Sequence, residues 1–101
     1  MNMPASIKVG PHVYSVLKKP AAEMGDSLGY CDFDKLEIWI TQRLRKSKAS
    51  EILVHECLHA CTHPSFNGYE KLDDETFVTA VAPVLLGVLR DNPKLLEYLT
   101  K

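Results

Sequence analysis

The segment Leu53-Val54-His55-Glu56-Cys57-Leu58-His59-Ala60-Cys61 is the most informative part of this chain, because it contains the pattern H-E-x-x-H. Each residue of an α-helix advances about 100°, so His55 and His59 differ by only about 40° and lie one turn apart. Two imidazoles in this arrangement can reach one metal ion. Glu56, about 100° round from His55, can contact a water bound to that ion. The spacing therefore predicts that His55 and His59 are metal ligands and that Glu56 activates the water.

The remaining residues of the segment are predicted to form the buried face of the same helix. With His55 as the reference, they fall at roughly 140° to 300° around the helix axis. Cys57 and Cys61 are on the wrong side to join the histidines on one ion, and we interpret them as small buried apolar residues. The predicted apolar face consists of Leu53, Val54, Cys57, Leu58, Ala60 and Cys61.

The overall composition is that of a small globular protein and excludes several classes. The chain has 101 residues and a formal net charge of −1, so we expect one domain (1–101) and no nucleic-acid partner. Its three cysteines do not form a disulfide framework, which favours a reducing cytoplasm. We find no signal peptide and no apolar run of the ~20 residues that a membrane span requires. We therefore expect a cytoplasmic protein with no membrane contact.

Residues 1–41 are predicted to be mainly strands. Short β-type runs occur at 7–9, 12–17, 30–33 and 36–40, and Gly10-Pro11 is a turn signal between the first two. The last two runs are expected to form a hairpin around a tight turn at Asp34-Lys35. We therefore predict an α+β fold, in which a small antiparallel sheet of three to four strands precedes the helices.

Residues 47–100 are predicted to be mainly helical. Ser47 or Ser50 could cap the H-E-x-x-H helix, which we expect to run to about Thr62. Pro64 is expected to stop it, because proline lacks the next backbone donor.

One or two further helices are expected to follow. The acidic residues Asp73 and Asp74 favour a helix start, and this second helix should run to about Arg90. Pro83 should kink it or divide it in two. A last short helix is expected from Pro93 to about Leu99.

A catalytic zinc needs a third protein ligand, and the best candidate in the sequence is Glu75. The helix that begins there is apolar nearly all round, so a carboxylate facing the H-E-x-x-H helix would need a metal or a charge partner. Asp74 is the next candidate, and His63, two turns beyond His55, is a third. Zinc is the natural ion for two imidazoles and a carboxylate.

These motifs resemble the gluzincin clan of metallopeptidases. The resemblance covers residues 29–92 and rests on Ile52 to Cys61, followed by the acidic helix start Asp73-Asp74-Glu75. It is most similar to the compact ImmA/IrrE-like and related phage-encoded zincin-like proteins. The resemblance implies a small sheet before the H-E-x-x-H helix, with a glutamate on the next helix completing the zinc site. It thus implies the ligands His55, His59 and Glu75, and Glu56 as the catalytic residue.

Two departures from related metallopeptidases are evident. The residue ten after His55 is Ser65, so the third histidine of the metzincins is absent. Thr79 stands where thermolysin-like enzymes have an aspartate four residues after the ligand glutamate. The group that would orient a ligand imidazole is therefore not identified by the sequence.

The leading hypothesis is a zinc-dependent metallopeptidase that hydrolyses a peptide or protein substrate, with the zinc-bound water activated by Glu56. The strand 36–40 is expected at the edge of the cleft, where an extended substrate could pair with it. Tyr69, His63 and Tyr98 are candidates to stabilise the oxyanion, and the sequence does not choose among them.

Two alternatives remain open. One is a non-catalytic zincin-fold protein that uses zinc structurally and binds a protein partner. The other is a helical interaction protein without a metal, in which His55 and His59 are ordinary surface residues.

Overall fold

The computed structural model describes the backbone of residues 2–66 and 74–101 and the side chains of residues 2–63 and 76–101. Strands come first along the chain and the long helices follow, so the predicted α+β class is confirmed. The elements are β1 (Ser6–Val9), β2 (His12–Lys19), α1 (Ala21–Met24), β3 (Gly29–Asp32), β4 (Glu37–Thr41), α2 (Lys46–Phe66), α3 (Asp74–Asp91) and α4 (Pro93–Thr100).

The four strands form one mixed sheet in the order β1-β2-β4-β3. Each local hairpin is antiparallel, β1 with β2 and β3 with β4. The central strands β2 and β4 pair in parallel, with Val16 opposite Ile38. The prediction of an antiparallel sheet is therefore wrong at its central pair. The connection from β2 to β4 contains α1 and β3, and it is long enough to return the chain for a parallel pairing.

The two hairpin turns follow their sequence signals. Gly10 has a φ of 58°, a left-handed conformation that glycine adopts without strain, between β1 and β2. At the second turn the Asp32 carboxylate accepts hydrogen bonds from the backbone N–H groups of Asp34 (3.0 Å) and Lys35 (2.9 Å). The predicted turn at Asp34-Lys35 is confirmed, and the aspartate at its start stabilises it.

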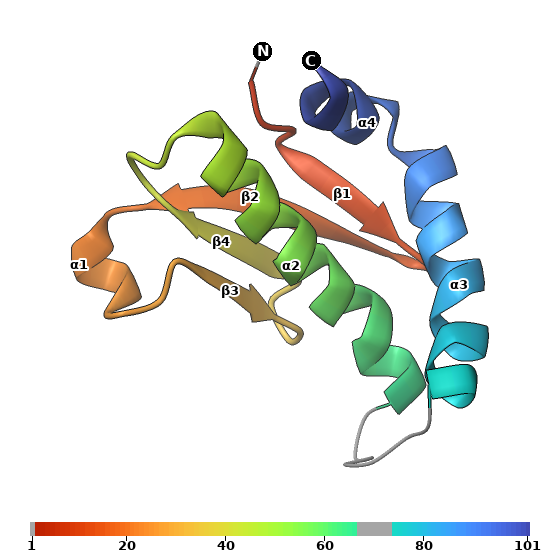
Figure 1. Ribbon diagram of the computed structural model, residues 1–101. Helices are drawn as coiled ribbons and strands as arrows, with labels where there is room; N and C mark the ends of the chain where they lie inside the picture. Colours follow the sequence, from red (N-terminus) through yellow and green to blue (C-terminus); the bar gives the residue numbers. More distant parts are fainter. Residues whose placement is uncertain (1, 67–73) are drawn as a thin grey trace.

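One long helix, α2, crosses a face of the sheet, whereas α3 lies beside β1 and α4 lies near the chain ends (Figure 1). Alternate residues of each strand point towards the helices, as the two-residue period of a strand requires. The core consists mainly of Ile7, Val9, Tyr14, Cys31, Ile38, Ile40, Leu53, Cys57, Ala60, Cys61, Val81, Val88, Leu95 and Tyr98.

The helix α2 is longer than predicted at both ends. It begins at Lys46, so Ser47 and Ser50 lie inside it, and the Ser50 hydroxyl donates to the Lys46 carbonyl (2.8 Å) instead of capping the helix. At the other end the helix continues through Pro64 to Phe66. A proline removes one backbone donor but leaves the donors of the following residues in place.

The helices after α2 agree more closely with the sequence. Pro83 lies inside α3, which remains one helix and is not divided in two. Pro93 occupies the first turn of α4, where its missing N–H has no intrahelical partner to lose. No helix among the described residues combines the length and the apolar character that a membrane span requires.

Candidate metal centre

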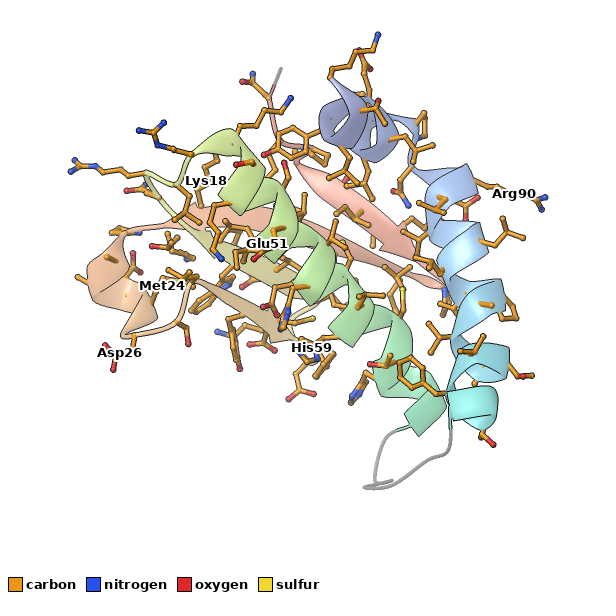
Figure 2. The ribbon with its side chains drawn as sticks, viewed as in Figure 1. Lys18, Met24, Asp26, Glu51, His59 and Arg90 are labelled. Carbon is orange, nitrogen blue, oxygen red and sulfur yellow. The ribbon has the colours of Figure 1, made fainter. Side chains whose placement is uncertain are left out.

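His55 and His59 lie side by side on the exposed side of α2, as the helical spacing predicts. Their Nε2 atoms are 3.2 Å apart, and their ring centroids are 4.9 Å apart at an interplanar angle of 71°. His59 projects from the side of α2 that borders β3 (Figure 2). The two Nε2 atoms thus point to one place next to the sheet edge.

The separation of the two nitrogens fits a shared metal ion. Imidazole nitrogens bind zinc at about 2.0–2.1 Å, and two such ligands of a tetrahedral ion are about 3.3 Å apart. The 3.2 Å between the Nε2 atoms of His55 and His59 matches this value without a change of rotamer. The same distance allows one neutral ring to donate an N–H to the other. The pair is therefore arranged to share either a proton or a metal.

Glu56 points away from solvent, between α2 and the sheet. Its residue surface is only 6% exposed, and it lines the same pocket as His55 and His59. Burial raises the pKa of the Glu56 carboxyl above its usual range, and the nearby His59 and His55 rings partly oppose this shift. A carboxylate in such surroundings is a stronger proton acceptor than one on an open surface.

Gly29 of β3 makes room for Glu56. A Cβ atom at Gly29 would lie 2.5 Å from Ile52 Cγ2 and 2.9 Å from Glu56 Oε2, both far inside contact distance. Only glycine therefore allows α2 to approach β3 this closely. Sequence reasoning missed this residue, although a glycine at a strand is a recognised signal of close approach.

The pocket beside the histidines lies over an edge of the sheet. Its volume is about 320 Å³, and its described lining includes Gly29, Tyr30, Cys31 and Phe33 from the β3 hairpin. The prediction that the strand 36–40 borders the cleft is wrong. In the sheet order β4 lies between β2 and β3, so both of its edges are occupied, and β3 is the edge strand at the site.

Two of the three candidates for a third ligand have side chains that the structure does not describe. Glu75 and Asp74 are in the first turn of α3, as predicted, but their side chains are not among those that the structure describes. Among the described residues, no group of three or more His, Cys, Asp and Glu side chains could hold a metal ion. His63, the other candidate, stacks on Phe33 with 3.8 Å between ring centroids and an interplanar angle of 7°.

Of the three candidates for oxyanion stabilisation, the structure describes Tyr98 and His63, and only His63 of these two is next to the pocket. Tyr98 is buried, and the Lys46 ammonium lies 5.2 Å from its ring centroid at the start of α2. That end of α2 is nine residues, or about 13 Å, from His55, so the prediction for Tyr98 is wrong. Tyr69 lies outside the described residues. His63 is held in the stack with Phe33, next to the pocket of His55 and His59.

All three cysteines are buried and free, and for Cys57 and Cys61 this confirms the prediction of small buried residues. Cys31 also lines the pocket from β3. Burial, together with the nearby Glu56 and Asp32 carboxylates, raises the pKa of the Cys31 thiol to about 12. The Cys31 thiol is therefore protonated near neutral pH and is a poor nucleophile there.

Comparisons of the chain with models of protein families, with curated proteins and with solved structures find no match.

Proposed function

We propose that this chain is a zinc-dependent, metallopeptidase-like hydrolase of peptide bonds. The observation that carries the proposal is the 3.2 Å separation of the His55 and His59 Nε2 atoms beside the buried carboxyl of Glu56. We assign the zinc to His55 and His59, with Glu75 as the third ligand because it lies in the first turn of the next helix, α3. All three groups are of the types that hold a catalytic zinc.

In this proposal the protein's main chemical task is proton transfer. Zinc, when bound, lowers the pKa of a coordinated water and polarises the carbonyl that is attacked. Glu56 accepts the water proton on its carboxylate and later delivers it to the leaving amine. Burial raises the proton affinity of Glu56, which favours the first of these steps. The close approach of Gly29 fixes the position of the side chain for both steps.

The substrate is proposed to lie along β3. The Leu28 carbonyl accepts from Thr41 N–H (2.9 Å), so alternation along the antiparallel pair turns the N–H and C=O groups of Gly29 and Cys31 away from β4. An extended peptide could bond these groups as a fifth strand. Its backbone would then pass beside His55 and Glu56.

The test uses Glu56→Gln, with Glu51→Gln as the matched control. Glu51 is on the same helix (Figure 2) but exposed, and it accepts a hydrogen bond from Lys48 at 2.8 Å. Zinc content is measured on protein prepared without an affinity tag, and cleavage is measured on a mixture of denatured proteins. We expect one zinc per chain in all three proteins, and a loss of cleavage of about 10³-fold or more in Glu56→Gln alone.

Three other results would favour an alternative function or contradict the role of Glu56. Zinc without cleavage in the wild type would favour the non-catalytic zincin-fold protein that binds a partner. No zinc in the wild type would favour the helical interaction protein. Equal cleavage by Glu56→Gln and the wild type would overturn the assigned role of Glu56.

A further inference from the structure

A second cavity lies next to the pocket of the histidines. Its volume is about 370 Å³, a size typical of ligand pockets. Its described walls are mainly apolar and come from both hairpins and from two helices, with Val9 on β1, Leu36 before β4, Ala60 on α2 and Val84 on α3. A cavity of this size and character accommodates a side chain such as leucine or phenylalanine.

The two cavities share one wall. Phe33, which follows β3, lines both of them, and its ring is held by the stack with His63. On α2 the pocket of the histidines is bordered by His55, Glu56 and His59. The apolar cavity is bordered by Ala60 and His63 of the same helix. The apolar cavity therefore continues the proposed metal site along α2, beyond the Phe33 end of β3.

The direction of β3 determines which side of the scissile bond would face this cavity. β3 runs from Gly29, at the histidines, towards Phe33, at the apolar cavity. A peptide that pairs antiparallel to β3, as β4 does, runs from the Phe33 end to the Gly29 end. Its residues at the apolar cavity therefore precede those at His55.

The distance between the two cavities indicates which substrate residue would lie at the apolar one. The middle of the stretch 60–63 is about 7 Å along α2 from the middle of the stretch 55–59. An extended chain covers this length in about two residues. We infer that the apolar cavity binds an apolar side chain about two residues on the N-terminal side of the scissile bond. This inference rests on the proposed function.

The first arm of the test determines cleavage sites by mass spectrometry after digestion of denatured proteins with the zinc-loaded chain. We expect leucine, phenylalanine and methionine to be enriched about two residues before the cleaved bond. Val84→Phe, which fills the cavity, should lower kcat/KM on peptides with leucine at that position by about tenfold or more. Val78→Phe, on the exposed side of the same helix, should leave kcat/KM unchanged.

The second arm measures binding without cleavage. Nuclear magnetic resonance spectra of the Glu56→Gln protein are recorded with acetyl-leucine amide and with acetyl-lysine amide. The leucine amide should shift the methyl signals of Val9, Leu36 and Val84, and the lysine amide should not. Val84→Thr keeps the side-chain volume but adds a hydroxyl, so it should weaken the shifts caused by the leucine amide. This variant replaces Val84→Phe in the test if Val84→Phe does not fold.

The outcomes separate the two proposals. Cleavage without apolar enrichment, or with enrichment on the C-terminal side of the bond, would overturn the inference and leave the proposed function standing. A wild-type preference retained in Val84→Phe would also overturn it. Absence of cleavage would overturn the proposed function, and absence of leucine amide shifts would then overturn the apolar cavity assignment as well.

Discussion

At one edge of the sheet, β1 turns the backbone N–H and C=O of Lys8 outward, and the side-chain amide of Asn92 bonds both of them at 2.8 Å. The same amide donates to the Val88 carbonyl at 2.7 Å, and α3 lies alongside this edge. At the other edge, β3 turns the corresponding groups of Gly29 and Cys31 towards the pocket that contains the histidines. One edge is closed by the protein's own side chain, whereas the other borders the candidate site.

This difference indicates that the two edges of the sheet have different roles. A bonded edge strand cannot accept a further strand, so the β1 edge can add to stability but not to peptide binding. At the β3 edge, no hydrogen bond within the described part of the chain uses the outward groups of Gly29 and Cys31, and in the proposed function an extended ligand pairs with them beside the H-E-x-x-H helix. Changes at β3 should therefore affect cleavage, and changes at β1 should affect folding. The predictions below test this division.

Among changes at the two edges of the sheet, the largest effect is expected from Gly29→Ala on β3. The added methyl group would collide with Ile52 and Glu56, so the Glu56 carboxylate must move relative to His55 and His59. We expect kcat to fall about hundredfold, with KM and zinc content nearly unchanged. Steady-state kinetics and metal analysis on the folded variant measure this.

Gly87→Ala is the matched control, because a Cβ at Gly87 on α3 meets no atom within 4 Å. It should keep the wild-type kcat. Equal kcat values for Gly29→Ala and the wild type would show that close approach of β3 does not position Glu56.

The next effect is expected from Asn92→Ala at the closed edge. It removes three hydrogen bonds and leaves the outward groups of Lys8 without their partner. We expect the free energy of unfolding to fall by about 2–3 kcal/mol, measured by urea denaturation, with no change in the cleavage rate of the folded fraction. Asn2→Ala, an exposed asparagine, should change it by less than about 0.5 kcal/mol. A slower rate at unchanged stability would contradict the division between the edges.

The local parts of the fold could be predicted from sequence, but their assembly could not. The Gly10 and Asp34-Lys35 turns gave both hairpins, because a turn and its flanking strands are set by neighbouring residues. The parallel pairing of Val16 with Ile38 depends on how the two hairpins join across α1. No residue near either strand encodes that choice.

In the candidate site, too, the sequence predicts local geometry but not which distant segments pack together. The positions of His55 and His59 follow from helical geometry alone. The buried face of α2 is rotated from the predicted one, so that Glu56 is buried while Val54 and Leu58 are 40% and 39% exposed. Apolar character favours Val54 and Leu58 for burial, but Gly29 lets β3 approach on the Glu56 side. The sequence of α2 carries no information about that neighbour.

A smaller effect is expected on the stability of metal-free Glu56→Gln. Because the folded-state pKa of Glu56 is raised, the protonated carboxyl favours the fold below pH 4.5, and this contribution is lost as the pH rises through the folded-state pKa. The glutamine has no charge to desolvate, so it should raise the free energy of unfolding by about 1 kcal/mol at neutral pH and less at pH 4. Glu51→Gln should show no such gain. A loss of stability at neutral pH would mean that the buried carboxylate is compensated by partners.

The smallest effect is expected from Asp91→Asn, which removes the ion pair between the Asp91 carboxylate and the Lys8 ammonium (3.2 Å) at the closed edge. Both side chains are about half exposed, so water and salt screen their attraction. The free energy of unfolding should fall by less than about 0.5 kcal/mol at low salt, and by less still in 1 M NaCl. Urea denaturation at the two salt concentrations, beside Asn92→Ala, measures both contributions. A loss equal to that of Asn92→Ala would mean that the exposed ion pair contributes as much as the amide bonded to the Lys8 backbone, and would contradict this ranking.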